Sequence, residues 1–200
     1  MRALSEPSRN PRMTRRELAA LPVGVGLLMS SSESVAAQAG QRAGGAAVNR
    51  IPLDDRKAIE DLFSTYVWAY DCSDEAGFLD LFTEDGLVVG LGKKHVGKEA
   101  MGAWFRYLLD IREREGDLWL HQAAHHRYVG SGSNYLVYSY ATHYNYAVEA
   151  KTYGVRSLGY FVSECVKQGA EWKFRRFSIS HWDKTAQPWK KPLPWDAAAT

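Results

Sequence analysis

The chain has 200 residues, of which 46% are hydrophobic and 24% charged, with seven prolines and two cysteines. This composition indicates one globular domain, and it excludes intrinsic disorder, a collagen-like repeat, a disulfide scaffold and a polytopic membrane protein. The first 39 residues hold five arginines and three glutamates, so they carry the whole net charge of +2. The neutral remainder argues against a nucleic-acid partner, because phosphate binding needs a basic face.

Aromatic residues are unusually frequent, with 25 Trp, Tyr and Phe residues that follow residue 60. They suit a pocket for a flat, apolar or phenolic small molecule. They equally suit a well-filled core, so composition leaves both interpretations open.

Residues 1–39 have the features of an export signal. The pair Arg15-Arg16 precedes a mildly apolar run over residues 18–29, and Ala37-Gln-Ala39 is a small-x-small cleavage pattern. These features are typical of a signal peptide, and the twin arginine indicates the Tat route. We expect an exported, periplasmic protein with no membrane contact after leader removal; the alternative is a disordered basic tail. Cys72 and Cys165 could pair there, although nothing in their spacing requires it.

Residues 40–53 are expected to be a linker, and residues 54–182 the folded domain. Apolar residues at spacings of 3, 1, 3, 1 and 3 from Ile59 to Tyr70 predict an amphipathic helix that begins after Pro52. A second short helix is expected over residues 78–82, a strand over 86–90 and a third helix over 98–112.

After residue 117 the pattern is typical of strands, which we expect over residues 125–130, 135–149, 156–166 and 172–179. Helices followed by long antiparallel strands predict an α+β fold, a cone-shaped barrel in which a long curved antiparallel or mixed sheet wraps three N-terminal helices. A cavity is expected between the two layers. Residues 183–200, with three prolines and two tryptophans, are expected to be an extended arm on the surface, the pocket mouth or a partner subunit.

Polar side chains are expected inside this cavity. Asp71 lies four residues after Val67 on the apolar stripe of the first helix, where a carboxylate is costly unless it is paired. Because His125 and His126 are adjacent on a strand, one of them must face inward. His143 and Asn145 share one face of the next strand. Such a cluster is either a satisfied part of the core or a functional site.

Several short motifs resemble one family. They are Tyr66-Val-Trp-Ala-Tyr-Asp71-Cys-Ser-Asp74, Phe78-Leu-Asp-Leu-Phe-Thr-Glu-Asp85, His126-Arg-Tyr-Val-Gly130 and Trp172-Lys-Phe174. Together, over residues 50–180, they resemble the SnoaL-like group of the nuclear transport factor 2-like superfamily, and the Trp-Ala-Tyr-Asp stretch is similar to that of scytalone dehydratase.

The resemblance implies that Asp71 and His126 form the acid–base dyad of a cofactor-independent lyase, with Tyr70 as a third catalytic residue. It implies that Tyr66, His143, Asn145 and Trp104 bind the substrate. Asp71 would stabilise the protonated His126, which would take a proton next to a carbonyl, while Tyr70 would bind the developing oxyanion. Gly90, Gly159 and Phe161 stand where scytalone dehydratase has polar pocket residues, so the dyad carries over and the exact substrate does not.

The expected partners are a small aromatic or polyketide-like compound and a second or third copy of the chain, as a homodimer or homotrimer; no metal or organic cofactor is expected. Other interpretations stay open. His121 and His125 could bind a metal if they lay on a helix, although no third ligand is placed. The same fold includes non-catalytic ligand-binding or scaffold domains, small dioxygenase subunits, isomerases, cyclases and formaldehyde-eliminating lyases.

Overall fold

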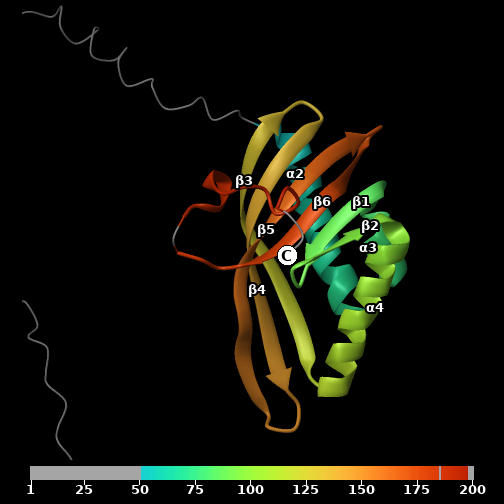
Figure 1. Cartoon of the computed structure of the whole chain (residues 1–200), viewed down its shortest axis with the longest axis vertical. Helices are drawn as coiled ribbons and strands as arrows, with labels where there is room; N and C mark the ends of the chain where they lie inside the picture. Colours follow the sequence, from blue (N-terminus) through green and yellow to red (C-terminus); the bar gives the residue numbers. More distant parts are fainter. Residues whose placement is uncertain (1–50, 185, 198–200) are drawn as a thin grey trace, which may run out of the picture. The chain divides into compact units, whose positions relative to one another are not determined.

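The computed structural model describes residues 51–184 and 186–197 (Figure 1). The expected signal peptide over residues 1–39 and residues 40–50 of the expected linker lie outside this range. Within it, no helix combines the length and the apolar character needed to cross a membrane.

Three α-helices form one layer of the described domain. Helix α2, Leu53–Asp71, follows Pro52 and carries Asp54 and Asp55 in its first turn, where carboxylates interact well with the helix dipole. Helix α3, Glu75–Asp80, is capped by Asp74, whose side chain accepts a hydrogen bond from the backbone N–H of Gly77. Helix α4, Gly97–Glu115, ends at Gly116, which has the left-handed φ of 68° that favours glycine after a helix.

The second layer is a six-stranded mixed sheet with the order β2-β1-β6-β5-β4-β3. Its strands are β1 Phe82–Gly90, β2 Lys93–Val96, β3 Leu118–Ser131, β4 Asn134–Ala147, β5 Thr152–Gln168 and β6 Glu171–His181. Strands β1 and β6 are parallel and the other neighbours antiparallel. The sheet ends at β2 and β3, so it curves over the helices without closing into a full barrel (Figure 1). The expected α+β fold is confirmed.

Several strands differ from the expectation. Strand β1 begins at Phe82 instead of residue 86, and β5 begins at Thr152 instead of residue 156. Strand β2 was not expected, and it exists because the turn at Leu91 and Gly92 returns Lys93–Val96 along β1. Strand β3 begins at Leu118 instead of His125, because residues 118–124 pair with the second half of β4.

A β-bulge interrupts β3 at His125. Pairing with β4 shifts between Ala124 and Arg127, and His125 has a φ of 54°. A bulge inserts one residue and so reverses the alternation of side chains beyond it. His121 before the bulge and His126 after it therefore both face the helices, although they are five positions apart and regular alternation would put them on opposite faces.

The core between helices and sheet is mainly aromatic. Six phenylalanines at most 2% exposed form its centre: Phe63, Phe78, Phe82, Phe105, Phe174 and Phe177. A smaller cluster on the other face of the sheet contains Tyr138, Tyr160 and Val162, and Trp195 of the C-terminal arm packs against it. The arm thus covers the outer face of the sheet. Cys72 is exposed and Cys165 buried, and both are free thiols.

Candidate active site

A cavity of about 350 Å³ lies between the helices and the sheet. Helix α2 contributes Tyr66 and Tyr70, α4 contributes Trp104, Leu108 and Ile111, and the strands contribute most of the rest. The other lining residues are Leu91 of the β1–β2 turn and, from the strands, Gly90, Trp119, His121, Ala141, His143, Arg156, Ser157, Leu158, Gly159, Phe161, Ile179, Ser180 and His181. The walls are mostly aromatic and aliphatic with a few convergent polar groups, as is usual for small-molecule sites.

Asp71 and His121 form the central polar pair of this cavity. The Asp71 Oδ1 atom lies 2.6 Å from the His121 Nδ1 atom, and Oδ2 accepts a hydrogen bond from the His121 backbone N–H at 2.9 Å. Both side chains are largely buried, with exposed fractions of 16% and 17%. Because Nδ1 faces the carboxylate, the neutral ring carries its proton there and leaves the Nε2 lone pair free to accept another proton. No described residue hydrogen-bonds to this Nε2 atom.

Local structure holds Asp71 in place. It is the last residue of α2, and its backbone carbonyl accepts a hydrogen bond from Arg112 Nη1 at 3.0 Å. The same guanidinium bonds to the hydroxyl of Ser73 just after the helix. Arg112 therefore joins α4 to the end of α2, and its positive charge is well placed at a helix C-terminus.

His143 stacks on His121 from the neighbouring strand. The two imidazole rings lie 4.3 Å apart with an interplanar angle of 27°. Burial lowers the pKa of His143 to about 4, and the neighbouring His121 and Arg156 act in the same direction. His143 is therefore neutral near physiological pH, and it contributes a flat surface beside the base.

Two phenols from α2 also border the cavity. The Tyr70 ring meets the His121 ring edge-on at 4.6 Å, and Tyr66 lies one turn earlier with a centroid distance of 6.4 Å to Tyr70. Burial raises the pKa of both hydroxyls, which keeps them protonated as donors. Neither hydroxyl has a hydrogen-bond partner among the described residues, so both are free to bind a ligand oxygen.

Three further polar atoms on the cavity walls are buried without a partner in the described chain. They are Nε1 of Trp104, Nε1 of Trp119 and Nε2 of His143. A buried N–H without an acceptor costs free energy. A ligand that carries oxygen acceptors would satisfy the indole groups, so the cavity favours an oxygenated compound over a pure hydrocarbon.

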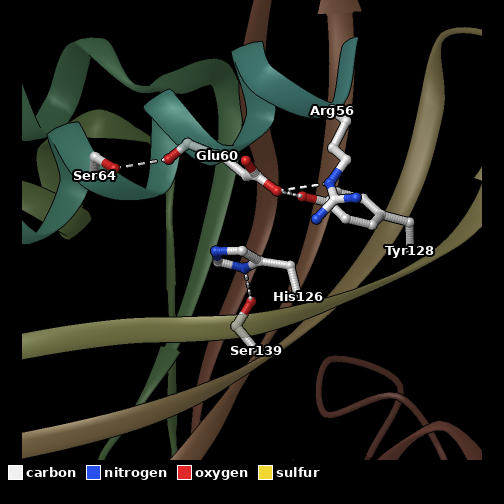
Figure 2. A network of polar contacts seen from close by, with 6 residues as sticks. All are labelled: Arg56, Glu60, Ser64, His126, Tyr128 and Ser139. Carbon is white, nitrogen blue, oxygen red and sulfur yellow. Dashed lines mark hydrogen bonds and ion pairs between the residues drawn. The ribbon is translucent and has the colours of Figure 1, made fainter. Parts of the chain in front are cut away.

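His126 lies elsewhere, and the expected pairing of Asp71 with His126 is not formed. Figure 2 shows His126 between α2 and the sheet, with Ser139 on one side and Glu60 on the other. Its Nδ1 atom bonds to the Ser139 hydroxyl at 2.6 Å, and its ring contacts Phe63 at 4.7 Å. Burial lowers the pKa of His126, against the opposing effect of Glu60. His126 is not among the residues that line the cavity.

Asp71 pairs with His121 and not with His126 because the two histidines lie beside different parts of helix α2. The end of α2 reaches β3 at His121, whereas His126 lies beside Phe63, two helical turns from Asp71. Glu60, still earlier in α2, accepts hydrogen bonds from Arg56 and Tyr128 (Figure 2). His126 therefore belongs to a polar network at the other end of the helix.

The remaining expected site residues separate into two groups. Tyr66, Tyr70, Trp104 and His143 line the same cavity as His121. Asn145 does not line it; its amide donates a hydrogen bond to Asp117 at 2.7 Å. His121 and His125 lie on strand β3 and face opposite sides of the sheet, so they do not form a helical metal pair.

His121 was not placed beside Asp71 from the sequence. Its signal was present, because Trp119, His121 and Ala123 alternate along one face of a strand. The resemblance instead pointed to His126, on the other side of the bulge, which pairs with Ser139 and not with Asp71.

The fold and this cavity define an α+β cone with an acid–base pair in its wall. Residues 52–178 match the family model of the SnoaL-like domain, so the chain belongs to the SnoaL-like domain family. No curated protein matches the chain significantly.

Solved structures show the same fold. A candidate scytalone dehydratase from Novosphingobium aromaticivorans superposes with a TM-score of 0.55 at 17% identity, over 70% of this chain and 97% of that one. ActVI-ORFA from Streptomyces coelicolor has a TM-score of 0.57 at 15% identity, over 64% and 97%. A protein from Catenulispora acidiphila in complex with S-DNPA has a TM-score of 0.57 at 16% identity, over 65% and 95%.

Proposed function

We propose that this protein is a cofactor-independent lyase that acts on a small aromatic or polyketide-like compound by proton abstraction and elimination. The observation that carries the proposal is the Asp71–His121 pair in the wall of an aromatic cavity. Paired titratable groups in a concave, largely apolar site are the usual arrangement of a general base.

His121 is the base in this proposal. Asp71 bonds to the ring through Nδ1 and to the backbone N–H of the same residue, so that Nδ1 carries the proton and Nε2 accepts one from the substrate. When Nε2 is protonated, the carboxylate stabilises the positive imidazolium. A base of this kind contributes about 10²–10⁴-fold to the rate, and orientation of the substrate in the cavity supplies the remainder.

The two phenols act on the other end of the reacting group. Proton loss next to a carbonyl places negative charge on the carbonyl oxygen, and the free hydroxyls of Tyr70 and Tyr66 are placed to donate hydrogen bonds to it. Their raised pKa values keep both protons on the phenols during this step.

Elimination then completes the reaction. The electron pair of the broken C–H bond forms a double bond to the adjacent carbon, and the hydroxyl group on that carbon leaves with its bonding pair. The proton held by His121 returns to the departing hydroxide and forms water. Substrate atoms are thus divided between an unsaturated product and water, and the enzyme returns to its starting state.

The dimensions and walls of the cavity support the substrate class. A volume of about 350 Å³ suits a compound of one to three rings, and the walls formed by Tyr66, Tyr70, Trp104, Trp119 and Phe161 suit flat rings. An isomerase, a cyclase or a formaldehyde-eliminating lyase would share the first proton transfer and differ in the product.

A proton-exchange experiment tests the shared step. A panel of aromatic β-hydroxy ketones is incubated with the protein in D₂O, and loss of the α-proton and formation of the enone are followed by NMR. We expect both signals with the wild type, neither with His121→Ala and both with His126→Ala, which is the matched histidine outside the cavity. Binding of these compounds without exchange or turnover in the wild type would show a non-catalytic binding domain instead.

We also propose that the protein is exported and assembles as a homodimer or homotrimer. The leader pattern of residues 1–39 supports export. Exposed apolar side chains that neighbour one another across three strands support self-association, namely Leu120, Tyr144 and Val155. Light scattering after size exclusion measures the oligomer, and a monomer at micromolar concentration would contradict this part of the proposal.

A further inference from the structure

A second cavity of about 460 Å³ lies on the face of the sheet opposite the helices. Its roof is formed by Trp182, which directly follows β6, and by Trp189 of the C-terminal arm, and the sheet forms its floor with Tyr138, Tyr140 and Tyr160. At the end of β6, successive side chains point to opposite faces of the sheet: His181 lines the first cavity and Trp182 lines the second. The sheet therefore separates the two cavities.

The arm that forms the roof is fastened to the domain. Trp195 is only 5% exposed and packs in the cluster that contains Tyr138 and Tyr160. Lys94 Nζ, on β2, donates a hydrogen bond to the carbonyl of Ala197 in the arm at 2.9 Å. Within the arm, Lys191 forms an ion pair with Asp183 at 2.7 Å. The arm is thus bound to the sheet and stabilised by an internal ion pair, so the cavity beneath it is a built part of the fold.

Aromatic rings from both layers surround the space. Trp182 lies 5.5 Å from Tyr140 and 6.4 Å from Tyr160, and Trp189 lies 6.1 Å from Tyr138. Trp182 and Trp189 are nevertheless 48% and 38% exposed, so part of each ring surface remains available to contact a ligand. Partly exposed aromatic rings around a concave space are suited to hold another flat ring.

The cavity also carries positive charge. The guanidinium carbon of Arg127 lies 4.4 Å from the ring centre of Trp189. Arg127 forms no hydrogen bond or ion pair with any described residue, and stacking leaves the in-plane N–H groups of a guanidinium free to bind a carboxylate. Lys184 adds a second positive charge, while the one carboxylate among the lining residues, that of Asp183, is paired with Lys191.

From these observations we propose that the second cavity is a binding site for a planar aromatic carboxylate. The ring of the ligand lies among Tyr140, Tyr160 and Trp182, and its carboxylate pairs with Arg127. The site is independent of the Asp71–His121 pair, because the sheet lies between them, and it does not rest on the proposed lyase activity.

Fluorine NMR can locate such a ligand. The full chain is produced with 5-fluorotryptophan at its seven tryptophans, and the signals of Trp182 and Trp189 are assigned with Trp→Phe variants. Three probes separate the contributions: 2-naphthoate has rings and charge, 2-naphthylmethanol has the rings alone and acetate has the charge alone. We expect 2-naphthoate to shift the Trp182 and Trp189 signals at concentrations at least about tenfold below those needed for the other two, as loss of a charged hydrogen bond predicts.

Two arginine variants complete the test. Arg127→Gln is expected to weaken 2-naphthoate binding about tenfold or more. Arg176→Gln is the matched control, because Arg176 also lies over a tryptophan of the arm, Trp195, but does not line the cavity, and it should bind as the wild type does. The Trp195 signal reports whether the arm stays in place. If Arg127→Gln displaces that signal, the variant cannot report on the arginine alone, and the salt dependence of wild-type binding is measured instead. Affinity for 2-naphthoate should then fall as the salt concentration rises.

Several results would overturn the site. They are shifts confined to Trp104 and Trp119 of the first cavity, equal affinity for 2-naphthoate and 2-naphthylmethanol, undiminished binding by a folded Arg127→Gln variant, salt-independent binding, or no shift with any probe.

Discussion

The carboxylate of Asp71 bonds twice to His121, once to the ring nitrogen and once to the backbone N–H. The ring contact sets the tautomer and the rotation of the imidazole, while the backbone contact fixes strand β3 against the end of helix α2. A base that is held in one orientation before substrate arrives needs no reorganisation during proton transfer. The predictions below follow from this pair and its surroundings.

Replacing Asp71 by Asn tests the charge without removing the hydrogen-bonding shape. The amide keeps an oxygen for the His121 backbone N–H, but it cannot stabilise the imidazolium. We expect kcat/KM to fall by about 10²–10⁴-fold, with a free energy of unfolding close to that of the wild type. Steady-state kinetics and urea denaturation measure the two quantities. An active Asp71→Asn enzyme would remove Asp71 from the mechanism.

Tyr70→Phe removes one donor to the developing oxyanion and keeps the ring that contacts His121. Loss of one such donor costs about 10²–10³-fold in kcat. KM should change little, because the interaction strengthens only as charge develops. A variant with raised KM and unchanged kcat would mean that Tyr70 merely binds substrate. Tyr128→Phe, outside the cavity, is the matched control.

His126→Ala should affect stability more than turnover. The substitution removes a ring from the core beside Phe63 and leaves the buried Ser139 hydroxyl without its partner. We expect a loss of about 1–3 kcal/mol in the free energy of unfolding, with kcat near the wild-type value. The opposite outcome, normal stability with abolished turnover, would return His126 to the catalytic role that the resemblance implied.

His143 should make the protein less stable in acid. The unfolded chain binds the proton at a pKa of 6.5, whereas the folded protein binds it only at about 4. Between these values the unfolded state takes up more protons, so the free energy of unfolding falls as the pH falls and is fully retained above pH 6.5. His143→Phe keeps a ring beside His121 without a titrating group, and its stability should depend less on pH between 6.5 and 4. Chemical denaturation across that range makes the comparison, and identical slopes would contradict it.

The leader prediction concerns residues outside the described range. If Arg15-Arg16 directs Tat export, replacing both with Lys should hold the full-length protein in the cytoplasm, whereas the wild type should appear in the periplasm cleaved after about Ala39. Cell fractionation and N-terminal sequencing give the answer. Periplasmic protein that retains residues 1–39, or equal export of the Lys variant, would contradict this assignment.

The elements that the sequence predicted well are those with strong periodicity. Helix α2 has an uninterrupted 3-1-3-1-3 apolar pattern, and its observed bounds, Leu53–Asp71, are close to the expected ones. Strands β5 and β6 are rich in β-branched and aromatic residues, and they join at a turn with Gly169. Local pattern is enough for such segments, because each periodicity buries one face in one type of element.

The parts that could not be predicted depend on pairing between distant segments. Strand β2 has only four residues, and nothing in Lys93–Val96 alone distinguishes it from a loop. Asp71 and four cavity residues could be placed from the helix stripe and strand parity, namely Tyr66, Tyr70, Trp104 and His143. The sequence could not predict which histidine pairs with Asp71, because that depends on the position of β3 along α2 in the folded structure.

The bulge at His125 also affects how this chain can be compared with its relatives. The face of the sheet on which each histidine lies depends on the number of residues between them. A single insertion or deletion between His121 and His126 would turn one of the two side chains to the outer face. Two homologues could thus carry the same His-x-x-x-Gly motif and place its histidine in different compartments of the fold. Alignment columns on the two sides of the bulge must therefore be matched separately, each against its own cross-strand partners on β4.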